Sequence, residues 1–454
     1  MSVMRSAVTK EKNILSDHSS SVSTYSPAHK DSRDGCPTVV ILAPPWPRSG
    51  TARVIQNQTA YYRQRGFLSV LVVVPFHWAY MQNRPIWEEI NEGIHDFGAD
   101  ELFVASLEPA RYKAAKYISS FRHAFRGTSL DWMIDLGRSS RLPEDVIASI
   151  RAARPVLLHI NHVYTLGFGL QLRQKLSGSS SRMPIILDTH DIQSHLLLEK
   201  GDVNPWTKKP DSLERLVLTE IEIMQKVDLF THLSVDDITF FQAHLPNKPH
   251  ILSMPTIDET FIERVNNTPP RSEAIDLMFV GQSHAPNLAA LKWFFAEVWP
   301  RVAARNYTFK VLGAVALFVQ EFLPKVYEEF RPCFVGEVAD LAPYYRAASC
   351  VIAPMVSGSG TSIKTIEALA LGKPFVGTTK AYRGMPMEKI EDAGLRAYDD
   401  PQGFADAITF ALANEAELGA RSRLAYEHLF SRNAAFATRD AAIELLRKAQ
   451  RLEV

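Results

Sequence analysis

The chain has 454 residues, of which 46% are hydrophobic and 22% charged, a composition typical of a soluble globular protein with more than one domain. Its 50 basic and 50 acidic residues cancel, so the whole molecule has no electrostatic attraction for nucleic acid, and attraction to a membrane must be local. Cys36, Cys333 and Cys350 show no paired spacing, which is typical of a reducing compartment.

The first 36 residues are rich in serine and contain no apolar run, which predicts a disordered tail. They contain no signal-peptide core, and no apolar segment elsewhere is long enough to span a bilayer. We therefore expect a cytoplasmic protein.

From residue 37 the pattern predicts strands that alternate with helices, as in an open parallel sheet. Residues 38–43 predict a strand, 51–65 a helix that Gly66 ends, and 68–74 a second strand. The loop before the helix ends at Gly50, which either lies near a ligand or only makes a tight turn. The loop does not match the dinucleotide fingerprint G-x-G-x-x-G.

Residues 107–126 combine basic and aromatic side chains. Ala114, Ile118, Phe121 and Phe125 share one helical stripe, while much of the positive charge lies elsewhere. The pattern predicts an amphipathic helix that either lies on an anionic bilayer or packs on the sheet with a solvated basic face. We expect peripheral membrane contact, at the inner face of the plasma membrane, to use this segment.

Polar residues follow two further predicted strands, 156–160 and 185–188, where ligands bind in open parallel sheets. Asn161, His162 and Tyr164 follow the first strand, and Thr189, His190 and Asp191 follow the second. Metal binding and structural turn hydrogen bonds are the alternatives for the histidines of this region. The histidines in question, which show no tight metal-ligand spacing, are His159, His162, His190 and His195.

The pattern restarts in the second half of the chain. Strands at 228–234 and 251–255 close the first half, and the polar segment 263–273 predicts a linker. A strand at 276–281, a loop and a helix at 287–298 then begin a second unit, with further strands at 307–312 and 333–335. We therefore expect domains at 37–262 and 274–432.

A glycine-rich loop in the second half predicts a phosphate site. The apolar strand 349–355 leads into Gly358-Ser359-Gly360-Thr361-Ser362, and a helix with Ile363, Ile366 and Ala370 on one stripe follows at once. Backbone N–H groups of such a loop approach an anion closely, and the helix N-terminus adds a positive dipole end.

Lys364 and Glu367 lie three residues apart in this helix and share a second stripe. The lysine can neutralise a phosphate, and the carboxylate can accept hydrogen bonds from ribose hydroxyls. An ordinary surface ion pair is the alternative interpretation. Gly372 and Pro374 end the helix, and 375–377 predicts the next strand.

This segment resembles the donor-site signature of retaining glycosyltransferases of the family 4 type (glycosyl transferases group 1), in the subgroup that has G-x-G-T-x-[IL]-K-x-x-E-A. Seven positions match: Gly358, Gly360, Thr361, Ile363, Lys364, Glu367 and Ala368. The more usual family pattern has a first glutamate where this chain has Ser359.

The resemblance implies an α/β protein of the GT-B fold, with two Rossmann-like, doubly wound parallel-sheet domains that face a cleft. It implies transfer of a sugar, with retention, from a nucleotide diphosphate sugar to an acceptor hydroxyl, without a metal or other cofactor. The acceptor would be a glycan or a lipid-linked glycan of surface polysaccharide or glycolipid assembly. The helix at 433–454 would pack back on the first domain.

The resemblance also implies roles for individual residues. Lys364 and the amides of residues 358–362 would stabilise the leaving diphosphate. Glu367 would bind the ribose, and His190 and Asp191 would orient the sugar or the acceptor. Gly50, in a loop similar to the glycine loop of the first GT-B domain, and Gly281, at the end of a predicted strand, complete the expected donor site.

Two alternative functions share these features. A nucleotide-sugar epimerase or hydrolase of the same fold would use the same diphosphate site with a second acid/base pair. A non-catalytic sugar-nucleotide-binding partner of an assembly complex would bind the donor without turnover.

Overall fold

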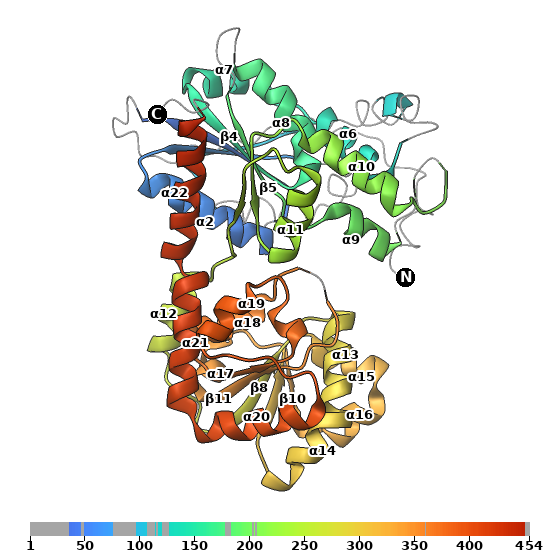
Figure 1. The fold of residues 1–454 in the computed structure, drawn as a ribbon, viewed down its shortest axis with the longest axis vertical. Coiled ribbons are helices and arrows are strands. Elements are labelled where there is room, and N and C mark those ends of the chain that lie inside the picture. The colour runs from blue at the N-terminus through green and yellow to red at the C-terminus, as the bar shows by residue number, and fades with distance from the viewer. Residues whose placement is uncertain are drawn as a thin grey trace, which may run out of the picture.

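The structure of the protein is a computed structural model that describes residues 36–46, 50–75, 97–106, 114, 117–119, 127–177, 183–201, 204, 207–358 and 360–449. This part of the chain forms two α/β units, one above the other in Figure 1. Each unit is built on its own parallel sheet, as predicted. The expected tail, and residues 107–126 apart from Ala114 and 117–119, lie outside the described residues.

The first unit contains a seven-stranded sheet with the order β3-β2-β1-β4-β5-β6-β7. All six residues of the central strand β1 (Thr38–Ala43) are buried, because helices cover both faces of a parallel sheet. The other strands are β2 (Leu68–Val73), β3 (Glu101–Val104), β4 (Pro155–Asn161), β5 (Ile185–Asp188), β6 (Leu229–His232) and β7 (His250–Leu252).

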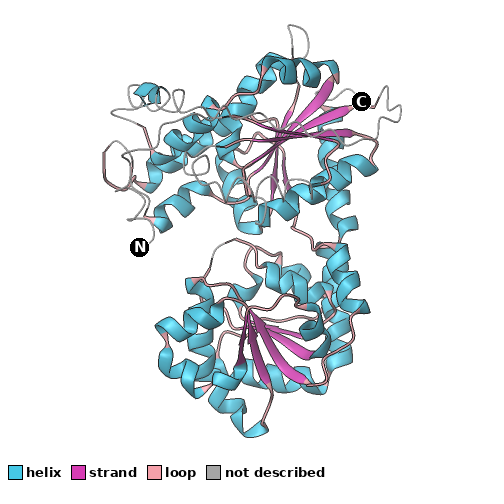
Figure 2. Ribbon diagram, turned by 180° about the vertical axis from the view of Figure 1, so that it is seen from behind, coloured by secondary structure: helices cyan, strands magenta, loops and turns pink. Residues whose placement is uncertain are grey.

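Helices flank this sheet on both faces (Figure 2). Two hydrophobic clusters lie on its opposite faces, since alternate residues of β1 belong to each: Val40 and Leu42 to one, Val39 and Ile41 to the other. The described helices of the unit are α2 (Gly50–Gln64), α6 (Ser129–Ser139), α7 (Glu144–Ala152), α8 (Val163–Leu176), α9 (Gln193–Lys200), α10 (Leu213–Met224) and α11 (Val235–His244).

The second unit contains a five-stranded parallel sheet with the order β10-β9-β8-β11-β12. Its strands are β8 (Ile275–Val280), β9 (Phe309–Leu312), β10 (Phe334–Gly336), β11 (Ala348–Ala353) and β12 (Phe375–Gly377). Its helices are α13 (Ala285–Trp293), α14 (Trp299–Val302), α15 (Val315–Phe322), α16 (Pro324–Glu329), α17 (Ala342–Ala347), α18 (Ile363–Ala370), α19 (Met387–Asp392), α20 (Pro401–Ala413) and α21 (Glu415–Leu429).

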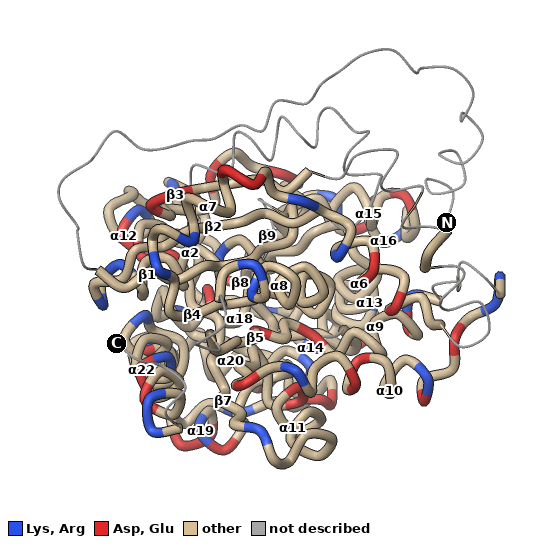
Figure 3. Tube along the Cα trace, turned by 90° about the horizontal axis from the view of Figure 1, so that it is seen from above, with Lys and Arg blue, Asp and Glu red and all other residues tan. Residues whose placement is uncertain are grey.

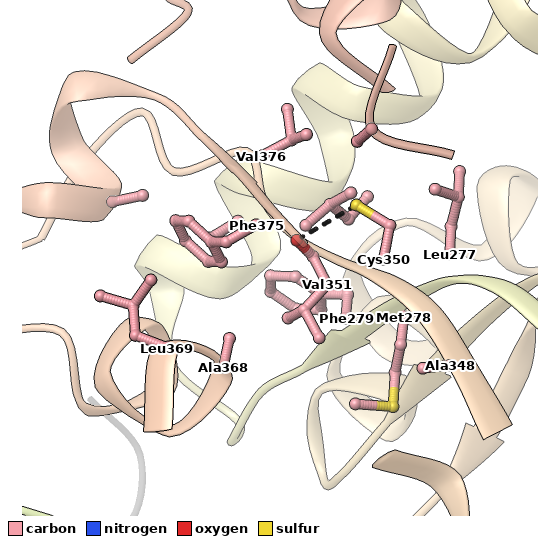
Figure 4. Packing of buried hydrophobic residues seen from close by; sticks show 14 of the residues in the cluster. Leu277, Met278, Phe279, Ala348, Cys350, Val351, Ala368, Leu369, Phe375 and Val376 are labelled. Carbon is pink, nitrogen blue, oxygen red and sulfur yellow. Dashed lines mark hydrogen bonds between the residues drawn. The ribbon is translucent and has the colours of Figure 1, made fainter. Parts of the chain in front are cut away.

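The core of the second unit fixes α18, the helix that carries Lys364 and Glu367. Figure 4 shows Leu277, Met278 and Phe279 of β8 beside residues of β11 and β12, with Ala368 and Leu369 of α18 close by. Ala368 and Leu369 are fully buried. Cys350 lies in the same core, where burial raises the pKa of its thiol well above the ordinary value. The helix is therefore anchored by its apolar stripe.

The predicted linker at 263–273 is partly wrong, because helix α12 (Glu259–Asn267) occupies its first half. The Asp258 side chain accepts a hydrogen bond from the Thr260 N–H and caps this helix. Val265 of α12 is buried in the core of the second sheet, together with Met254 and Ile257. The predicted helix 287–298 also differs: α13 begins at Ala285 and continues after Trp293 as one π-helical segment, Phe294–Val298.

The C-terminal helix α22 (Arg432–Lys448) connects the second unit to the first. With α21 it runs along one side of the molecule, on the left in Figure 1. Phe436, Ile443 and Leu446 of α22 are buried in a hydrophobic cluster with residues of β1 and β2. Asp440 accepts hydrogen bonds from the Arg65 guanidinium and the Tyr61 hydroxyl of α2.

Charged residues of both signs are interspersed along the described chain (Figure 3), in keeping with the net charge of zero. Within the described residues, no helix combines the length and the apolar character that crossing a membrane requires.

Candidate functional site

The carboxyl ends of the two sheets face each other. The Thr361 hydroxyl, from the loop after β11, donates to the carbonyl of Leu233, which follows β6, at 2.8 Å. The N–H of Val235 donates to the carbonyl of Gly384, beyond β12, at 2.8 Å. The loops that follow the strands of one sheet therefore contact those of the other, at the place where open α/β sheets bind ligands.

The glycine-rich loop lies between β11 and α18. Gly358 and Gly360 have φ values of +126° and +64°, a region that residues with a Cβ atom rarely adopt. A Cβ atom at Gly360 would lie 3.3 Å from Asp191 Oδ1 of the first unit, so glycine allows this close approach. Ser362 is buried and precedes α18, whose first N–H groups face the loop. Ser359 lies outside the described residues.

Lys364 lies within the first turn of α18 and directs its ammonium group away from bulk water. Nζ lies 2.5 Å from Asn287 Oδ1 and 4.5 Å from the centre of the Phe279 ring. Burial, and after it the nearby Arg383 guanidinium, lower the pKa of Lys364 to about 7, while Glu367 opposes the shift. An incoming anion would therefore meet a poorly solvated ammonium, which interacts with it strongly.

Gly281 supports this lysine indirectly. A Cβ atom at Gly281 would lie 2.9 Å from a ring carbon of Phe279 and 3.1 Å from Cγ of Asn287. The Asn287 amide also donates to the Gln282 carbonyl at 2.8 Å, which turns Oδ1 toward Lys364. Gly281 therefore gives room to the two side chains that surround Nζ. Asn287 was predicted only as the first residue of a helix.

Arg383 is a second cation at the loop. Its guanidinium carbon would lie 3.3 Å from a Cβ atom at Gly358, and burial lowers its pKa from the ordinary value. It follows the 3-10 segment Thr379–Tyr382 beyond β12. Arg383 was not predicted as a site residue, because its place beside the loop depends on how β12 pairs with β11. Lys364 and Arg383 together give the loop a positive charge.

Glu367 lies one turn beyond Lys364 and is bound from both units. Its Oε1 pairs with Arg53 Nη1 of α2 at 3.1 Å, and its Oε2 accepts from the Tyr345 hydroxyl at 3.2 Å. Burial, followed by the charge of Glu367, raises the pKa of Tyr345 well above its ordinary value. Tyr345 therefore stays a hydrogen-bond donor. Arg53 was not predicted as a site residue either. Its ion pair links the first unit to the Glu367 carboxylate.

His190 lies after β5 in the first unit, directly before Asp191, which approaches the glycine loop. It has a φ of +63°, and its Nε2 lies 2.9 Å from Asn161 Oδ1. Its ring stacks on that of His162 with centres 3.9 Å apart. Burial lowers the pKa of His190 to about 4, so its imidazole is neutral at pH 7.

The first helix reaches the same region. Thr51 Oγ1 lies 3.0 Å from His162 Nε2, and Gly50, which begins α2, is exposed. No heavy atom lies within 4 Å of a Cβ atom built at Gly50. The three residues before Gly50, which complete the predicted loop, lie outside the described residues.

Asp191, Glu220 and Asp237 are largely enclosed carboxyls of the first unit. Burial raises the pKa of Asp191 to about 6, that of Glu220 to about 7 and that of Asp237 to about 8. Near pH 7 Asp191 is therefore mostly ionised, whereas Glu220 is about half ionised and Asp237 mostly protonated.

The histidines for which metal binding was the alternative interpretation have other partners. His159 lies between Tyr62 and Asp188, while His195 contacts Phe240. Across the described ranges, no group of three or more His, Cys, Asp or Glu side chains could hold a metal ion.

Residues 274–414 match the family model of glycosyl transferases group 1. This range contains Gly281, the loop at 358–362, Lys364, Glu367 and Arg383. Solved structures decide the architecture, because three of them, two of which are named as glycosyltransferases, superpose on about nine-tenths of the chain. The chain has the GT-B fold. A comparison with curated protein sequences finds no match.

The similar GT-B structures differ widely from this chain in sequence. HepE of Anabaena, in complex with UDP, has a TM-score of 0.58 and 13% identity, over 91% of this chain and 100% of HepE. A glycosyltransferase of Rickettsia africae has a TM-score of 0.54 and 12% identity, over 91% of this chain and 99% of its own. The lipopolysaccharide outer core galactosyltransferase WaaB has a TM-score of 0.52 and 11% identity, over 89% and 98%.

Proposed function

We propose that the protein is a glycosyltransferase that moves a sugar, with retention, from a nucleotide diphosphate sugar to an acceptor hydroxyl. The observation that carries the proposal is the convergence of complementary groups where the two units contact each other. The second unit contributes the glycine loop, Lys364 and Glu367, and the first contributes Arg53 and the His190–Asp191 pair. The family match of the second unit supports the same reaction class.

The reaction requires stabilisation of the negative charge that develops on the departing diphosphate. The Lys364 ammonium, the Arg383 guanidinium and the free N–H groups at the start of α18 are placed for this role. Glu367 would accept hydrogen bonds from ribose hydroxyls, beside Arg53. His190 and Asp191 would orient the sugar or the acceptor. No step of this scheme depends on a metal or other cofactor.

The neighbouring structures suggest which donor to test first. HepE has been solved with UDP and with UDP-glucose, in the latter case with a TM-score of 0.53 and 13% identity to this chain. We therefore propose a UDP-sugar as donor. WaaB is named as a galactosyltransferase of the lipopolysaccharide outer core, which supports a glycan or lipid-linked acceptor of surface polysaccharide or glycolipid assembly.

The test is to incubate the protein with UDP-glucose, UDP-galactose and UDP-N-acetylglucosamine, alone and with saccharide acceptors. Release of UDP that depends on the acceptor, with a product anomeric proton of the same configuration as the donor's, is the expected result. Formation of an epimer, or release of sugar that acceptors do not increase, would instead indicate the epimerase or hydrolase. Calorimetric binding without turnover would indicate a non-catalytic binding protein.

Donor binding should weaken as pH rises above 7. Because burial lowers the pKa of Lys364 to about 7, the free protein loses this positive charge above that pH, whereas a bound diphosphate favours the charged form. Between pH 7 and 9, the donor Kd should rise by up to ~10-fold per pH unit, since each binding event takes up one proton. Calorimetry with UDP at pH 6 to 9 measures this slope. In Lys364→Arg the guanidinium stays charged, so the slope should flatten.

We also propose that the protein meets its acceptor at a membrane, through residues 107–126. Within this segment Tyr117 and Ile118 are described, and 76% and 59% of their surfaces are exposed. Each basic residue near an anionic membrane contributes ~1 kcal/mol to the binding free energy. More protein should therefore sediment with anionic than with neutral vesicles, and the amount bound to anionic vesicles should fall at high salt. Lys113→Glu/Lys116→Glu/Arg122→Glu should abolish the difference. Equal binding to both kinds of vesicle would contradict the proposal.

A further inference from the structure

We propose that Gln58 and Asn161 are positioning residues that hold His190 in its neutral Nε2–H form, so that Nδ1 faces the cleft only as a hydrogen-bond acceptor. The chemical group that fits this atom is a neutral hydroxyl, as on a sugar. The identity of that ligand rests on the proposed function, whereas the protonation state of His190 does not.

Asn161, the last residue of β4, has only one amide orientation that satisfies its neighbours. Its Nδ2 lies 3.1 Å from the carbonyl of Leu42, which can only accept. The amide nitrogen must therefore face Leu42, and Oδ1 must face His190. Because Oδ1 can only accept, the Nε2 atom of His190, at 2.9 Å, must carry a proton.

Gln58 of α2 fixes Asn161 from the other side. Its amide nitrogen donates to Asn161 Oδ1 at 2.9 Å and to Asp188 Oδ2 at 2.5 Å. Its Oε1 accepts from Asn161 Nδ2 at 2.9 Å. Gln58, Asn161 and Asp188 are all buried. The two amides therefore bind each other reciprocally, and a rotation of either would place like atoms together.

The hydrogen-bond network continues from Asp188 through His159 to Tyr62. Asp188 Oδ1 lies 3.0 Å from His159 Nε2, so this nitrogen carries a proton and donates it to the carboxylate. The Tyr62 hydroxyl lies 2.8 Å from His159 Nδ1. Asp188, at the centre of this network, can only accept hydrogen bonds, so Gln58 and His159 must both donate to it.

His190 stays neutral because its surroundings disfavour an imidazolium. Its ring is buried and stacks on His162, with an angle of 11° between the rings. Burial lowers its pKa to about 4; His159 acts in the same direction, and the charge of Asp188 opposes it. Burial also lowers the pKa of His162 well below its usual range, with a further contribution from His190. Two stacked neutral rings therefore lie beside Asp191, which approaches the glycine loop.

The free nitrogen of His190 is open to a ligand. Among the described residues no hydrogen bond is made by its Nδ1, and this atom is not one of the enclosed polar atoms that lack a partner. The next residue, Asp191, lies against Gly360 of the glycine loop. A donor whose diphosphate binds that loop would place its sugar near His190. The lone pair on His190 Nδ1 would accept a hydrogen bond from a sugar hydroxyl and would repel a group that can only accept.

The decisive experiment needs no substrate. In protein labelled with ¹⁵N at the histidine rings, the His190 signal, assigned by its loss in His190→Gln, should show the neutral Nε2–H form between pH 8 and pH 5. The Nδ1–H form, or an imidazolium at pH 7, would overturn the proposal. Because this measurement uses the resting protein, it remains valid even if no sugar donor is found.

Variants test whether Gln58 does the positioning. Gln58→Met removes the amide that fixes Asn161 and should give a mixed His190 signal, with transfer slowed roughly 10-fold. Tyr62→Phe is the matched control, because it removes one buried hydrogen bond of the same network at its far end. It should lower the unfolding temperature but keep the Nε2–H signal and a kcat within about 2-fold of the parent. An unchanged His190 signal in Gln58→Met, or equal changes in both variants, would refute the positioning role.

Donor analogues test the ligand. Among UDP-sugars that each lack one hydroxyl, one should lose roughly 10²-fold or more in kcat/KM, because Nδ1 would then face no donor. Its fluoro analogue should be as poor, since fluorine cannot donate. In Gln58→Met this discrimination should shrink. Tolerance of every deoxy donor by an active parent would refute the assigned hydroxyl contact and leave the proposed transfer reaction standing.

Discussion

Replacing Lys364 by alanine should slow sugar transfer by a factor of ~10² or more, because it removes the ammonium closest to the start of α18. Nζ is held by Asn287 and by the face of the Phe279 ring, so no reorganisation is needed when charge develops on the diphosphate. The loss should appear in kcat as well as in kcat/KM, since the leaving group gains charge in the transition state. Initial rates at saturating acceptor measure it.

Lys373 provides a matched control for this variant. It lies just beyond the other end of α18, donates to the Ala348 carbonyl at 2.7 Å, and has a pKa that burial lowers to about 8. Lys373→Ala therefore removes a similarly shielded ammonium from the same helix region, but away from the glycine loop. It should change the unfolding temperature more than the rate of transfer. Parent-like kinetics of a folded Lys364→Ala would show that the lysine is structural.

Local patterns were sufficient to predict most of the fold. The apolar runs at 38–43, 185–188 and 375–377 are strands, because each forms part of a parallel sheet that is covered on both faces. The glycine loop before α18 was recognised because the need for positive φ leaves a direct mark on residue choice. The capped helix α12 was missed, because its polar composition conceals a single buried stripe that includes Val265.

The partners of the candidate site residues could not be predicted, because they come from distant parts of the chain. Arg53 and Glu367 are 314 positions apart, and Asn287 and Lys364 are 77 apart. The contact between the two units brings Arg53 to Glu367, and the pairing of β8 with β11 within the second sheet brings Asn287 to Lys364. No local spacing distinguishes Arg53 or Arg383 from the many other arginines of the chain.

Gly281 illustrates the difference between a residue type and its role. Contact with the donor, suggested by its place at the end of a predicted strand, stays a prediction, and the structure adds that a Cβ atom there would crowd Phe279 and Asn287. The glycine thus acts on the site through the residues that surround Lys364. That role depends on side chains which a sequence pattern does not position.

Replacing Gly313 by alanine should destabilise the second unit by ~3 kcal/mol or more. Gly313 follows β9 with a φ of +95°, and a Cβ atom there would lie 2.3 Å from the Gly281 carbonyl oxygen. The positive φ costs ~1–3 kcal/mol for a residue with a side chain, and the overlap with rigid backbone adds a similar amount. The backbone cannot move freely, because the Gly313 N–H donates to the Gly336 carbonyl at 2.7 Å and Gly281 O accepts from the Val315 N–H at 3.1 Å.

Gly336 separates the two contributions to this loss. It has a φ of +84°, but no heavy atom lies within 4 Å of a Cβ atom built there. Gly336→Ala should therefore show only the cost of the backbone conformation, ~1–3 kcal/mol, and Gly313→Ala clearly more. Urea unfolding followed by the tryptophans of the second unit gives the comparison, with midpoints used because a protein of two units need not unfold in one step. Equal midpoints for the two variants would mean that the backbone at Gly281 moves to accommodate the methyl group of Gly313→Ala. In that case the geometry around Asn287 and Lys364 would be more adaptable than the close contact at Gly313 implies.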